Sequence, residues 1–156
     1  MQTILLDRRS REQCPSCGWI YYPQLKVGAG VLIEQNDAVL LVRRAIEPWK
    51  DAWYLPAGYV EADETPRSAA ERETREETGL IVRIGDLKGV YPFDDDPRGN
   101  GLLILYLADI CGGELQCSNE ASECRYFLAS ELPSNIAGMA HRQALADWAW
   151  RKAHGF

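Results

Sequence analysis

The sequence predicts an α/β fold. Two short apolar runs around a turn indicate a pair of strands within residues 26–43, and a charged segment with helix-start and helix-stop signals follows at 65–79. A nearly continuous apolar run at 102–110 indicates a buried strand, and a second helix is expected from residue 134. The order strands, helix, strands, helix is typical of an α/β domain. The chain of 156 residues is 46% hydrophobic and 26% charged, which suits one globular domain with a buried core.

We expect two parts, a lead-in over residues 1–25 and the main domain over residues 26–156. The first stretch, MQTILLDRRSREQ, becomes charged after six residues and has no signal-peptide core. No apolar run approaches the ~20 residues that a membrane-spanning helix requires. We therefore expect a cytoplasmic protein that makes no contact with a membrane.

The five cysteines are an odd number, and with no export signal they argue against a disulfide framework. Cys14 and Cys17 form a C-x2-C turn, which is half of a four-ligand zinc site. The other three, Cys111, Cys117 and Cys124, lack this spacing. We therefore do not expect a structural Zn²⁺ at Cys14 and Cys17. The half-site is either metal-free or completed only in a dimer.

The first strand is predicted from alternating apolar residues within 26–34, and AVLLVR predicts its partner at 38–43, after a turn at 35–37. We expect the two strands to form the opening hairpin of a mixed sheet. Arg43 and Arg44 end the second strand. They are candidates for binding a substrate phosphate, although arginines at strand ends are also commonly solvated.

The first helix is predicted from the signals at its ends. Thr65 suits the N-cap, Pro66 the first helical position, and Gly79 the residue just past the last turn. The segment from Gly58 to Leu80 reads GYVEADETPRSAAERETREETGL. Gly58 is expected to give the backbone the freedom for a tight loop before the helix.

Three glutamates of this helix, Glu73, Glu76 and Glu77, are three and four residues apart, so their carboxylates project from one face. Like charges at this spacing destabilise an isolated helix by roughly 0.2–0.5 kcal/mol per pair. A hard cation such as Mg²⁺ or Mn²⁺ would turn this repulsion into coordination. The alternative is a solvated acidic face, supported by pairs such as Glu71 with Arg75.

The spacing of charged residues and glycines in this segment resembles the signature of the Nudix hydrolases, G-x5-E-x7-R-E-U-x-E-E-x-G-U, where U is a bulky aliphatic residue. The one departure is Thr74, which occupies an aliphatic position of the signature. The matched charged residues and glycines are Gly58, Glu64, Arg72, Glu73, Glu76, Glu77 and Gly79. The resemblance implies the Nudix α/β/α sandwich, with a mixed β-sheet between helices, over residues 26–156.

The resemblance also implies roles for these residues. Glu73, Glu76 and Glu77 would bind two or three divalent ions, Mg²⁺ or Mn²⁺. Arg72 and Glu64 would hold the geometry of the loop and helix, with Arg72 as a salt-bridge partner. Family members often have a further glutamate six residues ahead of an aromatic residue, as a metal ligand or general base.

Glu120 lies six residues before Tyr126 and matches that position, with Glu123 as the alternative and an exposed loop acid as the non-catalytic interpretation. Glu120 and Glu76 both remain candidates for the general base. Before this segment we expect a strand at 81–90, a loop at 91–101 rich in helix and strand breakers, and a turn at Gly112 and Gly113, after the strand at 102–110. In Nudix proteins the loop after the first of these strands commonly shapes the pocket for the variable part of the substrate.

The lead-in resembles one branch of the family. CPSCGWIYYP is similar to the end of the zinc ribbon that precedes the catalytic domain of NADH, FAD and ADP-ribose pyrophosphatases. The upstream cysteine pair of that ribbon is missing. The NADH pyrophosphatase motif SQPWPFPxS is represented only by residues 90–93, VYPF, which disfavours reduced dinucleotide as the main substrate.

The C-terminal helix is expected from residue 134, with Leu145, Trp148, Ala149 and Lys152 on an amphipathic face. Trp148 and Trp150 suit core or dimer contacts. His141 and His154 lack neighbouring metal-ligand residues in the sequence and are assigned to the surface.

The resemblance implies metal-dependent hydrolysis of a nucleoside diphosphate linked to another moiety. ADP-ribose is the leading substrate and FAD or NADH the next, with AMP and a phosphorylated remainder as products. Two alternatives remain: a house-cleaning (d)NTP pyrophosphatase and a non-catalytic ADP-ribose-binding sensor. The net charge of −6 argues against nucleic acid as a partner. A homodimer is compatible with the sequence.

Overall fold

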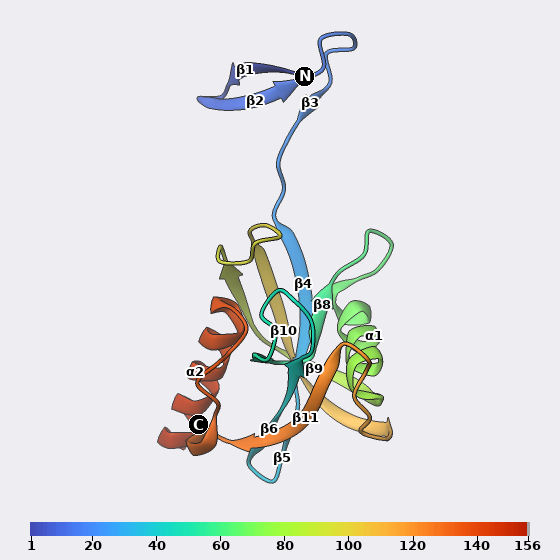
Figure 1. The fold of residues 1–156 in the computed structure, drawn as a ribbon, viewed down its shortest axis with the longest axis vertical. Helices are drawn as coiled ribbons and strands as arrows, with labels where there is room; N and C mark the ends of the chain where they lie inside the picture. Colours follow the sequence, from blue (N-terminus) through green and yellow to red (C-terminus); the bar gives the residue numbers. More distant parts are fainter. Residues whose placement is uncertain (156) are drawn as a thin grey trace.

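The N-terminal residues form a small sheet of their own. The computed structural model describes residues 1–155. Strands β1 (Gln2–Leu6), β2 (Arg9–Gln13) and β3 (Ile20–Tyr21) pair antiparallel in that order. Figure 1 shows this sheet standing apart from the rest of the molecule at the end of a single extended stretch. The lead-in is therefore a folded hairpin with a third strand.

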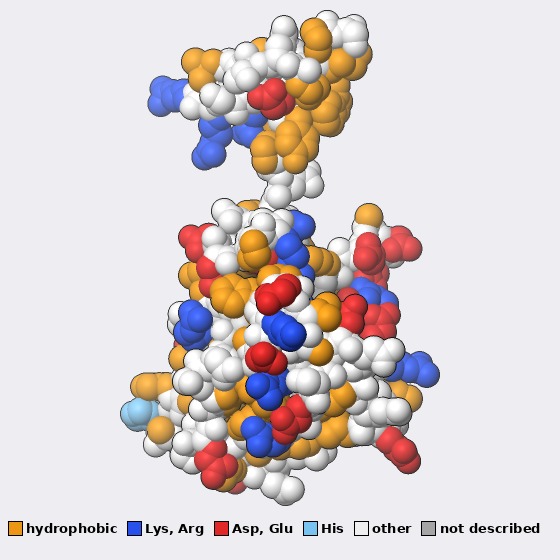
Figure 2. Space-filling model, viewed as in Figure 1, with side chains coloured by type: hydrophobic (Ala, Val, Ile, Leu, Met, Phe, Trp, Pro, Cys, Tyr) orange, Lys and Arg blue, Asp and Glu red, His pale blue; other side chains and the backbone are white. Residues whose placement is uncertain are grey.

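One surface of this N-terminal sheet is apolar. Its exposed large apolar side chains are those of Leu5, Trp19, Tyr21 and Tyr22. In Figure 2 hydrophobic side chains gather along one side of the small sheet, whereas acidic and basic side chains alternate over the visible face of the main domain.

The first sheet of the main domain has the order β8-β4-β10-β9. Its strands are β4 (Lys26–Leu32), β8 (Ala57–Tyr59), β9 (Leu80–Phe93) and β10 (Gly101–Gly113). The sheet is mixed, because β10 runs parallel to β4 while the other pairs are antiparallel. The apolar run predicted to be a buried strand lies in β10, between β4 and β9. The loop predicted at 91–101 is shorter in the structure and covers residues 94–100. Gly112 and Gly113, which we expected to form a turn, are instead the last two residues of β10.

The second sheet has the order β11-β6-β5, with β7 paired to β6. Its strands are β5 (Glu34–Gln35), β6 (Ala38–Arg44), β7 (Trp53–Tyr54) and β11 (Ala121–Leu128), and all their pairs are antiparallel.

The predicted opening hairpin is wrong in its extent. Only its tip forms, where β5 pairs with β6 and the Leu40 N–H donates to the Ile33 carbonyl at 3.0 Å. Before Ile33 the chain enters the first sheet, where β4 has β8 along one edge and β10 along the other. Since both edges of β4 are already paired, β6 pairs elsewhere and starts a second sheet.

Helix α1 (Pro66–Thr78) has the predicted ends. The Thr65 hydroxyl accepts from the Ser68 N–H, and Gly79 takes a left-handed conformation with φ 74°, from which its N–H donates to the Arg75 carbonyl. The Thr74 side chain is fully buried, and its hydroxyl donates to the Ala70 carbonyl at 2.7 Å. Threonine therefore fits this aliphatic position because the helix backbone satisfies the hydroxyl.

Helix α2 (Met139–His154) begins later than predicted. The preceding residues are extended: the Trp53 N–H donates to the Asn135 carbonyl, and the Ala137 N–H donates to the Trp53 carbonyl. Gly138, with φ 86°, then redirects the chain into the helix. The helix buries Trp148, whereas Trp150 is 56% exposed.

The two helices cover opposite sides of the sheets, as Figure 1 shows. One core cluster joins α2 to both sheets through Leu145 and Trp148 of the helix, Leu41 of β6 and Leu105 of β10. Another places Ala69 and Ala70 of α1 against β4. A short 3-10 turn, Ala129–Glu131, follows β11. The predicted α/β/α sandwich with a mixed sheet between helices is confirmed. Within residues 1–155, no helix is long and apolar enough to cross a membrane.

Candidate active site

A pocket of about 280 Å³ opens where the two sheets and the two helices meet. The first sheet contributes Gly28 and Gly58, the second contributes Arg44 and Tyr54, and α1 contributes two glutamates. The N-terminal end of α2 and the loop after β9 complete the lining. The signature segment therefore faces residues from every layer of the fold.

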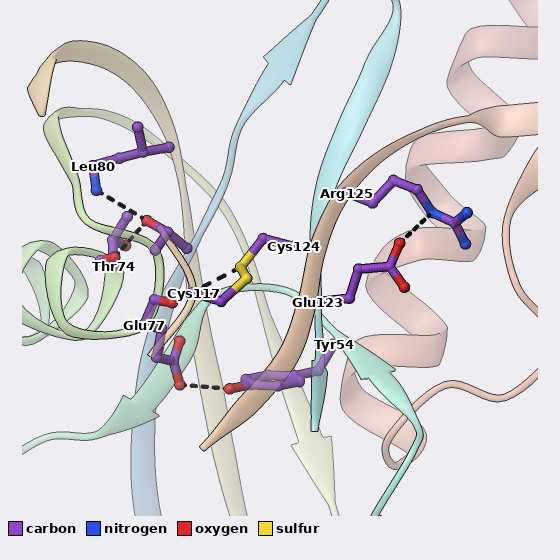
Figure 3. The surroundings of a disulfide bond; sticks show 9 residues. Tyr54, Thr74, Glu77, Leu80, Cys117, Glu123, Cys124 and Arg125 are labelled. Carbon is purple, nitrogen blue, oxygen red and sulfur yellow. Dashed lines mark hydrogen bonds and ion pairs between the residues drawn. A yellow bond between two sulfur atoms is a disulfide. The ribbon is translucent and has the colours of Figure 1, made fainter. Parts of the chain in front are cut away.

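Glu77 is held by two hydrogen bonds, more than either other glutamate of the pocket. Its Oε1 accepts from the Tyr54 hydroxyl at 2.7 Å, and its Oε2 accepts from the Ala57 N–H at 3.0 Å. Figure 3 shows the Tyr54 ring reaching across from the second sheet to the Glu77 carboxylate. Burial, assisted by the negative charge of Glu73, raises the pKa of Glu77 to about 8, because it outweighs the hydrogen bonds from Tyr54 and Ala57 and the charge of Arg44.

Glu73 enters the same pocket against the backbone of β8. Its side chain is 16% exposed, and Arg72 Nη1 donates to its Oε1 at 2.7 Å. A Cβ added at Gly58 would overlap the Glu73 carboxylate. Gly58 lies within a strand, so its lack of a side chain makes room for Glu73 and does not serve the loop freedom that we expected. Burial also raises the pKa of Glu73.

Arg72 ties the loop to the helix. Its Nε and Nη2 donate to both oxygens of Glu64, at 3.0 and 2.5 Å, and Nη2 also donates to the Tyr59 carbonyl at 3.0 Å. This guanidinium and the Glu61 N–H hold the pKa of Glu64 at about 2. The geometry is the bidentate one for which arginine is suited.

Glu76 lies outside the pocket. Its side chain is 58% exposed, and its Oε2 accepts from Arg72 Nη1 at 3.2 Å. Arg72 thus bridges Glu73 and Glu76 on the helix surface. Within residues 1–155, no group of three or more His, Cys, Asp or Glu side chains is close enough to form a complete metal site.

Glu120 lies in the pocket, on the loop before β11. The loop is anchored at both ends: the Ser118 N–H donates to the Glu77 carbonyl at 3.2 Å, and the Ala45 N–H donates to the Glu120 carbonyl at 2.9 Å. The alternative residue, Glu123, is absent from the lining and pairs with Arg125 at 3.4 Å. Figure 3 shows Glu123 and Arg125 on the side of β11 away from Glu77.

The same loop is closed by a disulfide between Cys117 and Cys124, which corrects our expectation of a chain without disulfides (Figure 3). Their Cα atoms are 5.9 Å apart, within the usual range for a disulfide. The pairing was not visible in the sequence because the loop folds back on the end of α1, where the Gln116 N–H donates to the Thr78 carbonyl at 2.8 Å.

The two arginines at the end of β6 point in different directions, as neighbours on a strand do. Arg44 lines the pocket, with its Nε bonded to the Pro48 carbonyl at 2.6 Å and its guanidinium 5.5 Å from the centre of the Tyr54 ring. Arg43 is absent from the lining and lies near Asp51, at 3.9 Å. Only Arg44 is placed to meet a substrate.

His141 was wrongly assigned to the surface. It lines the pocket from the first turn of α2, and its Nδ1 accepts from the Leu55 N–H at 3.2 Å. Burial and the charge of Arg44 lower its pKa to about 4. The signal was in the sequence: residue 141 precedes Leu145 by four positions and Trp148 by seven, so it belongs to the buried face of the helix.

The loop after β9 borders the pocket, as expected. Asp96 and Arg98 form an ion pair at 2.7 Å, and the Arg98 guanidinium lies 5.3 Å from the centre of the Tyr59 ring. Trp49 and Phe93 add aromatic surface to the lining. This mouth has the apolar and polar mixture typical of a small-molecule site.

Cys14 and Cys17 lie in the turn between β2 and β3, far from the pocket. The Gly18 N–H donates to the Cys14 carbonyl at 2.9 Å. Hydrogen bonds, first from the Ser16 hydroxyl, lower the pKa of Cys14 to about 7. The absence of a structural Zn²⁺ at Cys14 and Cys17 stays a prediction.

The fold and the signature define a class. Residues 24–148 match the NUDIX domain family, and the chain belongs to that family. It is a Nudix hydrolase, an enzyme of the pyrophosphohydrolase kind.

One relative is the ADP-ribose pyrophosphatase of Methanocaldococcus jannaschii, 38% identical over 118 residues, which are 75% of this chain and 69% of the relative. Another is the NAD-capped RNA hydrolase NudC of Deinococcus radiodurans, 33% identical over 131 residues. That match covers 81% of this chain and 45% of NudC, so the chain spans less than half the length of this relative.

Among solved structures, a Nudix hydrolase from Nitrosomonas europaea superposes with a TM-score of 0.85 at 33% identity. The superposition covers 99% of this chain and 89% of the other. The similarity therefore includes the N-terminal sheet as well as the catalytic domain.

Proposed function

We propose that this enzyme hydrolyses a nucleoside diphosphate linked to another moiety, with ADP-ribose as the leading substrate and FAD or NADH as the next. AMP and a phosphorylated remainder are the products. The observation that supports this proposal is one pocket that joins Glu73, Glu77 and Glu120 to Arg44. The relative named as an ADP-ribose pyrophosphatase supports the choice of substrate.

The donor set fits Mg²⁺ or Mn²⁺, which prefer carboxylate oxygens. Glu73 and Glu77 both have pKa values raised by burial, so each would gain from a cation. We assign Glu73, Glu76, Glu77 and Glu120 as the residues that would hold the ions, with Glu76 leaving its contact to Arg72. Bound divalent ions would neutralise pyrophosphate charge and lower the pKa of an attacking water.

The remaining roles belong to side chains of the chain itself. Of the two general-base candidates, Glu120 suits the role better because it already faces the pocket, and within residues 1–155 no donor occupies its carboxylate. Arg44 binds a substrate phosphate, whereas Arg43 does not. Glu64 and Arg72 hold the loop, and Gly79 ends the helix so that the chain can turn into β9.

A product assay tests this proposal. ADP-ribose, FAD, NADH and dNTPs are offered with Mg²⁺ or Mn²⁺, and again with EDTA. We expect metal-dependent release of AMP from one of the first three. Release of inorganic pyrophosphate from dNTPs alone would favour the house-cleaning alternative. Saturable ADP-ribose binding without turnover would favour the sensor.

The Glu76→Gln variant tests the role of the exposed glutamate. We expect it to fold normally and lose turnover, and retained activity would remove Glu76 from the metal-binding set.

The prediction that nucleic acid is not a partner is untested. Because one relative is named as an NAD-capped RNA hydrolase, NAD-capped RNA is added to the substrates of the product assay. The cytoplasmic location and the homodimer also stay predictions. Light scattering, which measures the molar mass in solution, tests the homodimer.

A further inference from the structure

The ring nitrogen of His141 that carries the proton can be assigned from its hydrogen bonding. The Leu55 N–H donates to its Nδ1 at 3.2 Å, so Nδ1 must offer its lone pair. A neutral imidazole has one protonated nitrogen, and the proton therefore lies on Nε2. The backbone just after β7 thus fixes the tautomer of a side chain on α2.

The groups around the ring favour the neutral form. The positive charge of Arg44 acts on it, and the Tyr54 ring meets it edge to face, with centroids 5.7 Å apart and planes at 85°. Asp95, which also lines the pocket, accepts at its Oδ2 from the Met139 N–H at the start of α2, at 3.0 Å. Because no carboxylate pairs with the ring, protonation brings no compensating contact.

The Nε2–H is left without a protein acceptor. Within residues 1–155, no group accepts a hydrogen bond from it, although the ring lines the pocket. Arg44 also lines the pocket: its Nε donates to the Pro48 carbonyl at 2.6 Å, and no described residue accepts a hydrogen bond from its terminal nitrogens. The pocket is therefore lined both by donors that lack a protein acceptor, on His141 and Arg44, and by the carboxylates of Glu73, Glu77 and Glu120.

We infer that His141 is a substrate-binding residue whose neutral Nε2–H donates to a non-bridging phosphate oxygen, with Arg44 as the cationic partner in the same subsite. This inference rests on the proposed function, since it specifies how that pocket holds a phosphate. The carboxylates can meet the phosphates only through metal ions, so His141 and Arg44 orient the phosphate directly. A neutral donor adds direction without adding charge next to Arg44.

Two substitutions separate the two nitrogens of the ring. His141→Asn places an amide atom near the Nδ1 position, where it can still accept from Leu55, but removes the donor at Nε2. His141→Gln reaches the Nε2 position with an amide N–H. We expect kcat/KM to fall by roughly 10-fold or more in the Asn variant, the typical effect of losing a hydrogen bond to a charged group, and to be largely retained in the Gln variant.

The same substitution at His154, an exposed histidine on the same helix, is the matched control and should leave kcat/KM unchanged. Thermal midpoints and Mn²⁺ affinity measured on all variants show whether the fold and the metal site are intact. Full activity in His141→Asn would overturn the inference. An equal loss in the Asn and Gln variants that follows a fall in the thermal midpoint would also overturn it.

A spectroscopic test does not need turnover. In ¹⁵N-labelled protein at pH 7, we expect His141 to show a protonated Nε2 and an unprotonated Nδ1, and Nε2 to shift when inorganic pyrophosphate and Mg²⁺ are added. The opposite tautomer, or a signal that pyrophosphate leaves unchanged, would contradict the inference. If the enzyme cleaves none of the offered substrates but Nε2 still responds to pyrophosphate, the proposed reaction fails while the phosphate subsite stands.

Discussion

Gly58 and Glu73 occupy adjoining space so closely that neither position is independent of the other. A Cβ on Gly58 would meet the carboxyl carbon and both oxygens of Glu73. Glu73 cannot move freely, because Arg72 holds it on the other side at 2.7 Å. The spacing between the signature glycine, Gly58, and the glutamate at 73 therefore has a steric reason in this fold.

Replacing Gly58 by alanine should therefore abolish most activity while the chain still folds. The added methyl group displaces the Glu73 carboxylate, and we expect kcat to fall by at least 100-fold, as a displaced catalytic group typically causes. Gly112→Ala is the control, because its Cβ would come no closer than 3.6 Å to Ile81. Steady-state kinetics and circular dichroism on both variants are the measurements. Normal activity in Gly58→Ala would show that Glu73 is not needed where it lies.

The pKa of His141 predicts how stability responds to acid. Its pKa is lowered from 6.5 to about 4 in the folded chain, so below pH 6.5 the unfolded chain binds a proton that the folded chain does not. Stability is lost as the pH falls from about 6.5 to about 4. Urea unfolding at pH 7 and pH 5 should show a smaller loss in His141→Gln than in the wild type, while His154→Gln should follow the wild type. Parallel curves for all three proteins would contradict the lowered pKa.

The loop glutamates provide a matched pair. Glu120 lines the pocket, whereas Glu123 pairs with Arg125 outside it. We expect Glu120→Gln to lower kcat by roughly 100-fold or more, because general acid–base catalysis typically contributes 10²–10⁴. Glu123→Gln should stay within about twofold of the wild type, since an exposed ion pair contributes little. The pH profile of kcat for both variants is the measurement, and equal activity of the two would remove Glu120 from the mechanism.

The disulfide between Cys117 and Cys124 can be checked chemically. Under non-reducing conditions alkylation should reach only the free cysteines, Cys14, Cys17 and Cys111, and mass spectrometry counts the labels. Reduction should add two more. Cys117→Ser should lower the free energy of unfolding by roughly 2 kcal/mol, from the chain-entropy value for so short a loop. Cys111→Ser is the control, and five labels without reductant would contradict the bridge.

Local signals in the sequence were sufficient for much of the fold. The ends of α1 were predicted correctly because Thr65, Pro66 and Gly79 act through bonds within one turn of the helix. The two sheets were not separated, because the divergence of β4 and β6 at Ile33 depends on which edges are already occupied. Pairing of strand edges is a tertiary event that alternation of residues does not encode.

The candidate site followed the same division. Helical spacing placed Glu73 and Glu77 together, but it also included Glu76, which the structure leaves on the surface with Arg72. His141 has helical spacing to Leu145 and Trp148, which indicates a buried position but not a place in the pocket. Its contact with Leu55 spans 86 positions of the chain, beyond any local pattern.

The pocket has no wall that belongs to a single structural unit. Gly58 lies in the first sheet, Arg44 in the second, Glu77 on one helix and His141 on the other. A substrate that contacts all four residues would link the two sheets and the two helices across the boundary where the sheets meet. Ligand binding should therefore do more than raise the midpoint of unfolding by mass action. It should also suppress local unfolding of either sheet alone, so that amides in both sheets gain protection from hydrogen exchange together.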